Sequence, residues 1–141
     1  MNWYLLAFKN YANFSGRARR KEYWMFILFH YLIILLLYIL IITFSINLGD
    51  TSEMAIPEII LSILLLLYFL ATIIPYLAIT VRRLHDINKS GGYWFVRFIP
   101  LVGPIWLLIL LVEDSWDGVN RYGPNPKGFY NDDEINKIGM E

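Results

Sequence analysis

Long apolar runs without a formal charge dominate the pattern of hydrophobic and polar positions along this chain. No charged residue lies between Glu22 and Asp50, and none lies within 59–81. A helix rises about 1.5 Å per residue, so each run can cross a hydrocarbon core about 30 Å thick. Both runs are apolar on all sides, whereas a helix on a soluble core has one polar face. The pattern therefore predicts transmembrane helices over 24–48 and 59–81.

A third apolar run, over 93–112, is less regular than the first two. It contains Arg97 and the helix-breaking segment PLVGP. Proline removes a backbone donor and kinks a helix, so the run allows two interpretations. One is a single kinked span in which Arg97 reaches the headgroups from one end, and the other is a re-entrant hairpin that turns at PLVGP. We favour the span, so the predicted fold is all-α with about three transmembrane helices.

The interfacial and basic segment over 1–22 predicts a short amphipathic helix in the headgroup plane, ended by Ser15 and Gly16. An interfacial helix is favoured over a soluble one because the chain offers no soluble core for packing. The apolar positions that fall on one helical face are Trp3, Tyr4, Ala7, Phe8, Tyr11 and Phe14.

The composition of the chain changes after Val112. The residues that follow are polar and rich in glycine, proline and asparagine, which predicts turns and a disordered end. We expect one membrane domain over 1–127 and a polar, disordered tail over 128–141. Overall, 57% of residues are hydrophobic and 17% are charged, against about 45–50% and about 25% in soluble domains. The composition therefore agrees with a membrane protein.

The basic residues predict how the chain is oriented, because lysine and arginine in short loops mark the cytoplasmic side. Five of the twelve basic residues precede the first span, and the loop before the second span has none. The loop RRLHDINKSGG after the second span is basic again. We therefore expect the N-terminus and this loop in the cytoplasm. The side of the C-terminal tail depends on whether the third run spans or re-enters.

Two arginine-rich segments, FSGRARRKEYW and VRRLHD, end at the same predicted membrane surface. One interpretation is a topology anchor, and the other is a site for anionic headgroups or a partner protein. Within the segments, we expect Glu22 to orient Arg19, and Asp86 to pair with Arg82 or Arg83 if the second helix continues. The candidate binding residues are Arg17, Arg19, Arg20, Lys21, Arg82, Arg83 and Asp86.

Two further polar residues are expected at membrane depth, His30 and Arg97. A hydrogen-bonded His30 inside the helix bundle is favoured over a proton relay, because no aspartate or glutamate lies within the spans. The His85–Asp86 pair lacks further ligands with metal-site spacing, and cysteine is absent, so no metal or other cofactor is expected. The chain has no recognisable catalytic motif either, which predicts a protein that is not an enzyme.

Three segments in a fixed order, with apolar runs between them, carry a family resemblance. They are FSGRARRKEYW, RRLHDINKSGGYW and NRYGPNPK. Together they resemble the YhaH-like family of small bacterial inner-membrane proteins, known as domain of unknown function 805. The resemblance runs from about Trp3 to Lys127. It implies an all-helical protein of the inner membrane and no established activity, so it transfers no catalytic residue.

The leading functional hypothesis is a non-enzymatic inner-membrane protein whose basic cytoplasmic face binds anionic lipid or a partner protein. The alternative is a small channel or transporter subunit, which is suggested by His30, Arg97 and the broken third run. It would have to oligomerise, because three spans enclose no pore. Membrane lipids, a second copy or another membrane protein are the expected partners. Nucleic acid is not expected, because the basic residues adjoin lipid-embedded spans.

Overall fold

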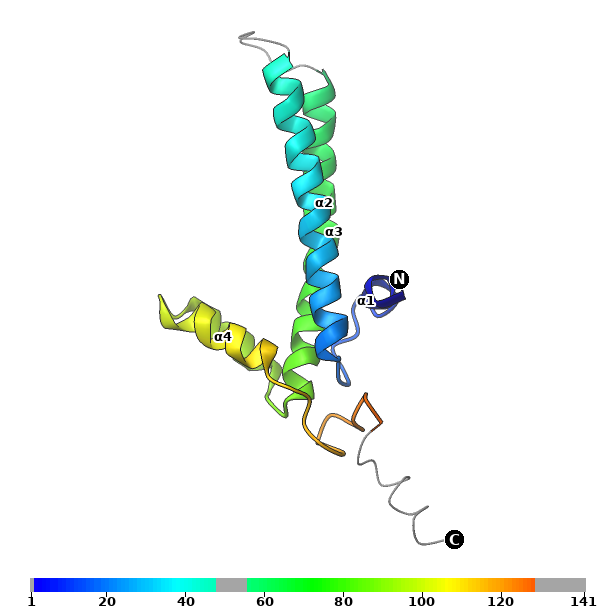
Figure 1. The fold of residues 1–141 in the computed structure, drawn as a ribbon, viewed down its shortest axis with the longest axis vertical. Helices are drawn as coiled ribbons and strands as arrows, with labels where there is room; N and C mark the ends of the chain where they lie inside the picture. The colour runs from blue at the N-terminus through cyan, green and yellow to red at the C-terminus, as the bar shows by residue number, and fades with distance from the viewer. Residues whose placement is uncertain (1, 48–55, 129–141) are drawn as a thin grey trace, which may run out of the picture.

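The computed structural model describes residues 2–47 and 56–128 of the chain (Figure 1). Within these ranges there is no strand, only an isolated bridge between Asn120 and Gly123. The prediction of an all-α fold is confirmed for this part of the chain, whereas the tail predicted to be disordered over 128–141 lies outside it except for Gly128. The helices are α1 (Asn2–Lys9), α2 (Arg20–Asn47), α3 (Ile56–Asp86), the 3-10 helix η1 (Gly91–Phe98) and α4 (Val102–Val112).

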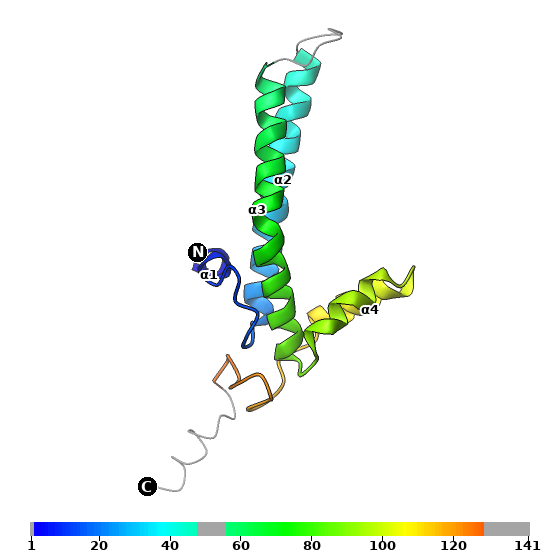
Figure 2. The ribbon, with the colours of Figure 1, turned by 180° about the vertical axis from the view of Figure 1, so that it is seen from behind.

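Helices α2 and α3 lie side by side and antiparallel along the long axis of the molecule (Figures 1 and 2). Both are long and apolar enough to cross a membrane, and only 17% and 11% of their most apolar stretches are buried. The core helix of a soluble protein would be mostly buried, so these exposed apolar surfaces need hydrocarbon around them. The two helices correspond to the spans predicted over 24–48 and 59–81.

Helix α3 continues beyond the predicted span and ends at Asp86. Asn88 adopts a left-handed conformation with φ 59°, and the N–H of Lys89 donates to the carbonyl of Leu84 at 2.9 Å. This is the Schellman arrangement that closes helix C-termini. The extra turn brings Arg82, Arg83 and Asp86 to the end of α3 beside the start of α2. We call this end of the α2–α3 pair the base.

Helix α1 packs against the α2–α3 pair near the base and is shorter than expected. It ends at Lys9, so the prediction that Ser15 and Gly16 end it is wrong. The N–H of Asn13 donates to the carbonyl of Asn10 and forms a turn. Tyr11 and Phe14 consequently lie outside the helix and are exposed. Ala7 is buried, and the rings of Tyr4 and Phe8 contact Phe26 of α2.

The third apolar run folds as a hairpin, and the favoured single span is not formed. The chain leaves η1, reverses at Pro100 and Leu101, and returns in α4 (Figures 1 and 2). Pro100 cannot donate a backbone hydrogen bond, and Leu101 has a φ of 65° that no helix tolerates. Gly103 then lies against the Val96 carbonyl so closely that an added Cβ would be 2.0 Å from its oxygen. The segment thus has the hairpin shape of the re-entrant alternative, and it extends to one side of the α2–α3 pair (Figures 1 and 2).

Candidate functional site

Buried charged and polar side chains from three parts of the chain meet at the base. We call them the basal cluster: Arg17, Glu22, Arg82, Arg83, Asp86 and Ser115. Isolated buried charges are very unfavourable, so such groups need partners of opposite charge and further hydrogen bonds. The cluster brings together the N-terminal segment, the end of α3 and the loop after α4. How each charge is compensated decides what this site can do.

Asp86 is at the centre of the basal cluster, and its side chain is completely buried. Arg17 Nε donates to Oδ1 at 3.0 Å, and Arg83 Nη1 donates to Oδ2 at 2.5 Å. The hydroxyl of Ser115 donates to Oδ2 at 2.6 Å. Asp86 thus pairs with two arginines in one site. The pairing with Arg83 was predicted from the helical spacing, whereas the contact with Arg17 was not.

Arg17 connects the N-terminal segment to the loop after α4, and its side chain is 1% exposed. Its Nη1 donates to the carbonyls of Gly118 and Gly123 at 2.8 and 3.2 Å. Its Nη2 donates to the carbonyl of Trp116 at 2.6 Å and to that of Asp86 at 3.3 Å. Because every guanidinium nitrogen has an acceptor, Arg17 holds this loop against the end of α3.

Two arginines bind the C-terminal end of α4. Arg83 Nε donates to the Leu111 carbonyl at 3.1 Å, and Nη2 donates to the Glu113 carbonyl. Arg20 Nη1 donates to the Val112 carbonyl at 3.2 Å. The last carbonyls of a helix lack intrahelical donors, and cations are favourable there. These bonds fix the re-entrant hairpin to the base.

Arg82 and Glu22 form the other ion pair of the cluster, with Arg82 Nη1 3.2 Å from Glu22 Oε1. Glu22 thus pairs with Arg82, a contact that the sequence did not predict, and of the two arginines expected to pair with Asp86 it is Arg83 that does so. Arg82 lies across from α2, so the nearest buried carboxylate for it belongs to Glu22. Nε and Nη2 of Arg82 are buried and have no acceptor within the described ranges.

The loop after α4 is folded onto the end of α3 by contacts of His85. The His85 and Tyr122 rings stack with centroids 3.7 Å apart and planes at 5°. His85 Nδ1 lies 3.2 Å from the Gly16 carbonyl, which can only accept, so Nδ1 is the donor. Asn120 Nδ2 donates to the His85 carbonyl at 2.9 Å. The predicted turns over 113–128 are thus an ordered cap on the base.

The predicted basic patch is divided between the interior and the surface. Arg17, Arg82 and Arg83 are buried and bound to partners within the chain, so they do not lie on an exposed face. The physical reason is that Asp86 and Glu22 compensate these cations away from solvent. Of the other candidates, Arg19 is half-buried, and Arg20 and Lys21 are exposed. Their role in binding stays a prediction.

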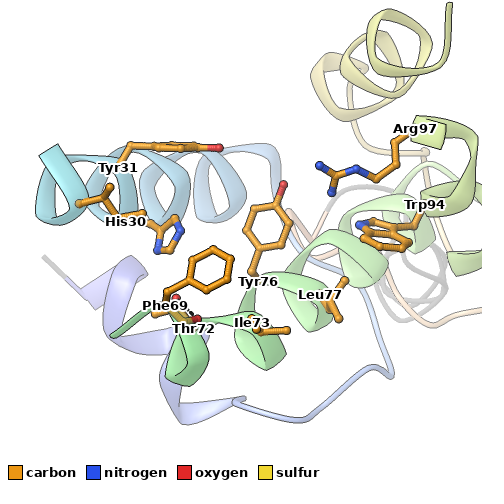
Figure 3. A pocket seen from close by; sticks show the side chains of 10 residues that line it. His30, Tyr31, Phe69, Thr72, Ile73, Tyr76, Leu77, Trp94 and Arg97 are labelled. Carbon is orange, nitrogen blue, oxygen red and sulfur yellow. Dashed lines mark hydrogen bonds between the residues drawn. The ribbon is translucent and has the colours of Figure 1, made fainter. Parts of the chain in front are cut away.

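His30 and Arg97, the polar residues expected at membrane depth, line one cavity between α2, α3 and η1 (Figure 3). His30 is buried, and its Nδ1 is 3.1 Å from the Tyr68 hydroxyl across the helix pair. It is thus a hydrogen-bonded residue of the bundle, as expected. Arg97 is exposed, and its guanidinium carbon lies 5.1 Å from the centre of the Trp94 ring.

Comparisons with known proteins agree with this architecture. A family model described as a protein of unknown function, DUF805, matches residues 11–124. The chain belongs to the DUF805 family. It is 39% identical to the inner membrane protein YhaI of Escherichia coli strain K12 over 127 residues, which cover 90% of this chain and 97% of YhaI. It is 38% identical to the inner membrane protein YhaH of the same strain over 130 residues, covering 90% and 98%. No solved structure matches the chain.

The family resemblance drawn from three sequence segments is therefore confirmed, and the three segments meet at the base of this structure. FSGRARRKEYW supplies Arg17 and Glu22, and RRLHDINKSGGYW supplies Arg82, Arg83 and Asp86. NRYGPNPK supplies the side chains that pack on His85. The names of these DUF805 relatives describe them as inner membrane proteins and give no enzymatic activity. The prediction of an inner-membrane protein of unknown function therefore agrees with what is known of these relatives.

Several residues of the site were missed by sequence reasoning. Ser115 lies in the polar segment after Val112 that was predicted only to form turns, and Asn120 and Tyr122 belong to a segment used only for the resemblance. Trp94 and Tyr76 were treated as ordinary apolar residues of the spans. No group of three or more metal-ligating side chains occurs in the parts of the chain that the structure describes. The polar residues that follow directly after the third apolar run could have predicted the cap.

Proposed function

We propose that this DUF805 protein is a two-span inner-membrane protein with both ends in the cytoplasm, which binds anionic lipid at the inner leaflet and does not catalyse a reaction. The distribution of basic residues supports it. No lysine or arginine occurs between Lys21 and Arg82, so the α2–α3 pair carries these residues only at the base. The basic residues of the described chain gather at the base and in the segments attached to it. Such asymmetry marks the cytoplasmic side of a membrane protein.

The hairpin over 93–112 supports the same side for the tail. Because α4 returns to the base, the loop that follows it meets the N-terminal segment. Arg17 donates to the carbonyls of Gly118 and Gly123, which ties the two segments together. Two full spans and one re-entrant segment then leave both ends of the described chain on one side of the bilayer.

Reporter fusions test this topology. We expect a fluorescent reporter that folds only in the cytoplasm to be active when it is fused after Gly128. A phosphatase that is active only in the periplasm should be inactive at the same position. As a matched control, the phosphatase fused after Asn47, at the far end of α2, should be active. Phosphatase activity after Gly128 would contradict the re-entrant hairpin and the placement of the tail.

The lipid-binding part of the proposal depends on the cations that remain at the surface. Lys9, Arg20 and Lys21 are exposed near the base, and Arg20 also donates to the Val112 carbonyl. A lysine or arginine near an anionic leaflet contributes roughly 1 kcal/mol of attraction. Because the apolar surfaces of α2 and α3 set the depth of the protein, these cations lie at headgroup level. The enrichment of anionic lipid around the protein should depend on them.

Reversal of two surface charges tests the lipid interaction. The protein, reconstituted in mixed phosphatidylglycerol and phosphatidylcholine bilayers, is extracted in polymer-bounded discs and its retained lipid is analysed. We expect the wild type to be enriched in phosphatidylglycerol and Lys9→Glu/Lys21→Glu to lose that enrichment several-fold. High salt should reduce the wild-type enrichment too, because salt screens exposed charges. An enrichment unchanged by reversal and by salt would count against lipid binding and favour a topology anchor.

A further inference from the structure

A cavity of about 330 Å³ opens on one side of the α2–α3 pair, where η1 packs against α3 (Figure 3). Apolar side chains of α2 and α3 form most of its wall, and Trp94 and Arg97 of η1 line it from the other side. A second hollow of about 300 Å³ runs between α2 and α4 toward Leu107. Tyr31, Tyr76 and Arg97 line both hollows, so the two meet at these residues.

Two polar groups that line the cavity lack an acceptor or a counter-ion within the described chain, although the Arg97 guanidinium lies over the Trp94 ring. Nε1 of Trp94 is buried and has no acceptor. Arg97 takes part in none of the ion pairs formed by the described residues. Figure 3 shows its guanidinium group directed toward the hydroxyl of Tyr76, at the open side of the cavity. The indole N–H of Trp94 has no acceptor, and the Arg97 cation has no counter-ion beside the apolar walls. Both groups therefore favour a ligand with an anionic oxygen.

We propose that the two hollows bind one anionic phospholipid, with its phosphate on Arg97 and Trp94 and one acyl chain in each hollow. Arginine binds phosphate oxygens through two parallel hydrogen bonds, and the indole N–H offers a further donor. The two hollows meet at Arg97, as the two acyl chains of a phospholipid meet at its headgroup. Each volume is at the lower end of the roughly 300–1,000 Å³ of ligand cavities, so each hollow holds part of a chain.

The site is separate from the surface lysines and rests on one element of the proposed function, the re-entrant position of residues 93–112 in the membrane. It predicts a single retained lipid, whereas the surface lysines predict a general enrichment of anionic lipid. Charge reversal at Lys9 and Lys21 should therefore leave the retained lipid in place. The two proposals can fail independently.

Native mass spectrometry of the full chain, released from detergent with phosphatidylglycerol or phosphatidylcholine added, counts bound lipids. We expect the wild type to retain one phosphatidylglycerol and Arg97→Gln to bind it about tenfold more weakly. Arg121→Gln is the matched control, because Arg121 is also exposed and lies over an aromatic ring, 4.8 Å from the centroid of Tyr122. Its lipid binding should equal that of the wild type.

A second variant, Ile73→Trp, fills the cavity and leaves Arg97 in place. We expect it to lose the retained phosphatidylglycerol by a similar factor, while circular dichroism shows unchanged helix content. Equal retention of both lipids, or wild-type retention by Arg97→Gln, would overturn the proposal. Loss of lipid in Ile73→Trp alone would indicate an uncharged amphiphile in the cavity and would overturn the assignment of phosphate to Arg97.

Discussion

Replacing Asp86 with asparagine is expected to lower the free energy of unfolding by about 3–5 kcal/mol, the cost of removing one partner from a buried ion pair. The carboxylate of Asp86 accepts hydrogen bonds from Arg17, Arg83 and Ser115, and the Asp86 side chain is fully buried. Asparagine keeps the shape of the side chain and removes its charge. Two guanidinium groups would then share the interior without an anion. Equilibrium unfolding in one detergent, followed by circular dichroism, measures the change.

The control for this prediction is Asp114→Asn. Asp114 pairs with Lys127, but its side chain is 66% exposed, so the pair should contribute less than about 1 kcal/mol. The hydrogen bond from Lys127, followed by the backbone N–H of Ser115, lowers the pKa of the Asp114 carboxyl. A lowered pKa in the folded state means that this small stabilisation is present above the unfolded pKa. It is lost as the pH falls through the folded pKa.

A double variant separates the ion pair from other effects of Asp86→Asn. Arg17→Gln removes one of the two cations that pair with Asp86, so it should lessen the imbalance left by Asp86→Asn. We therefore expect the double variant to be less destabilised than the sum of the two single variants. Additive effects, or a loss of stability in Asp86→Asn no larger than in Asp114→Asn, would contradict the central position of Asp86.

Gly103→Ala is expected to open the re-entrant hairpin and to destabilise the protein by about 3 kcal/mol, at the upper end of overpacking costs. The added Cβ would lie 2.0 Å from the Val96 carbonyl oxygen and 3.1 Å from its carbon, so η1 and α4 have to separate. Both of these contacts are backbone atoms, which cannot move aside as a flexible side chain can. Hydrogen–deuterium exchange over residues 91–112 should accelerate, because separation exposes the backbone of η1 and α4.

Gly92→Ala provides the matched control within η1. Its added Cβ would meet no atom closer than the Ser90 hydroxyl oxygen at 3.6 Å, an ordinary van der Waals contact. We expect its unfolding and its hydrogen exchange to resemble those of the wild type. If Gly103→Ala behaved like Gly92→Ala, the close packing of η1 on α4 would be refuted.

The spanning helices could be predicted from the sequence, because a long charge-free run leaves the chain no other stable environment than lipid. The ends of the helices were less predictable. α1 stops at Lys9 because a turn at Asn10 and Asn13 competes with the helix, although the apolar pattern continues to Phe14. The third run had two permitted conformations, and the contact of Gly103 with Val96 distinguishes them.

The pairings of the charges show where sequence reasoning stopped. Helical spacing found Arg83 with Asp86, three residues apart, because both side chains lie on one face of α3. Arg17 lies 69 positions from Asp86, and Glu22 lies 60 from Arg82, so no local pattern connects them. The cavity at Arg97 depends in the same way on how η1 packs on α3.

The sequence by itself determined that this is a membrane protein with two long spans, through its apolar runs and its one-sided distribution of lysine and arginine. The reason is that the solvation of a helix depends on the residues of that helix. Only the tertiary structure decided that three arginines are buried in the base and that the third run turns back. Burial of a charge depends on which carboxylate lies opposite it. That partner is supplied by a segment distant along the chain, so it becomes evident only when the helices are packed.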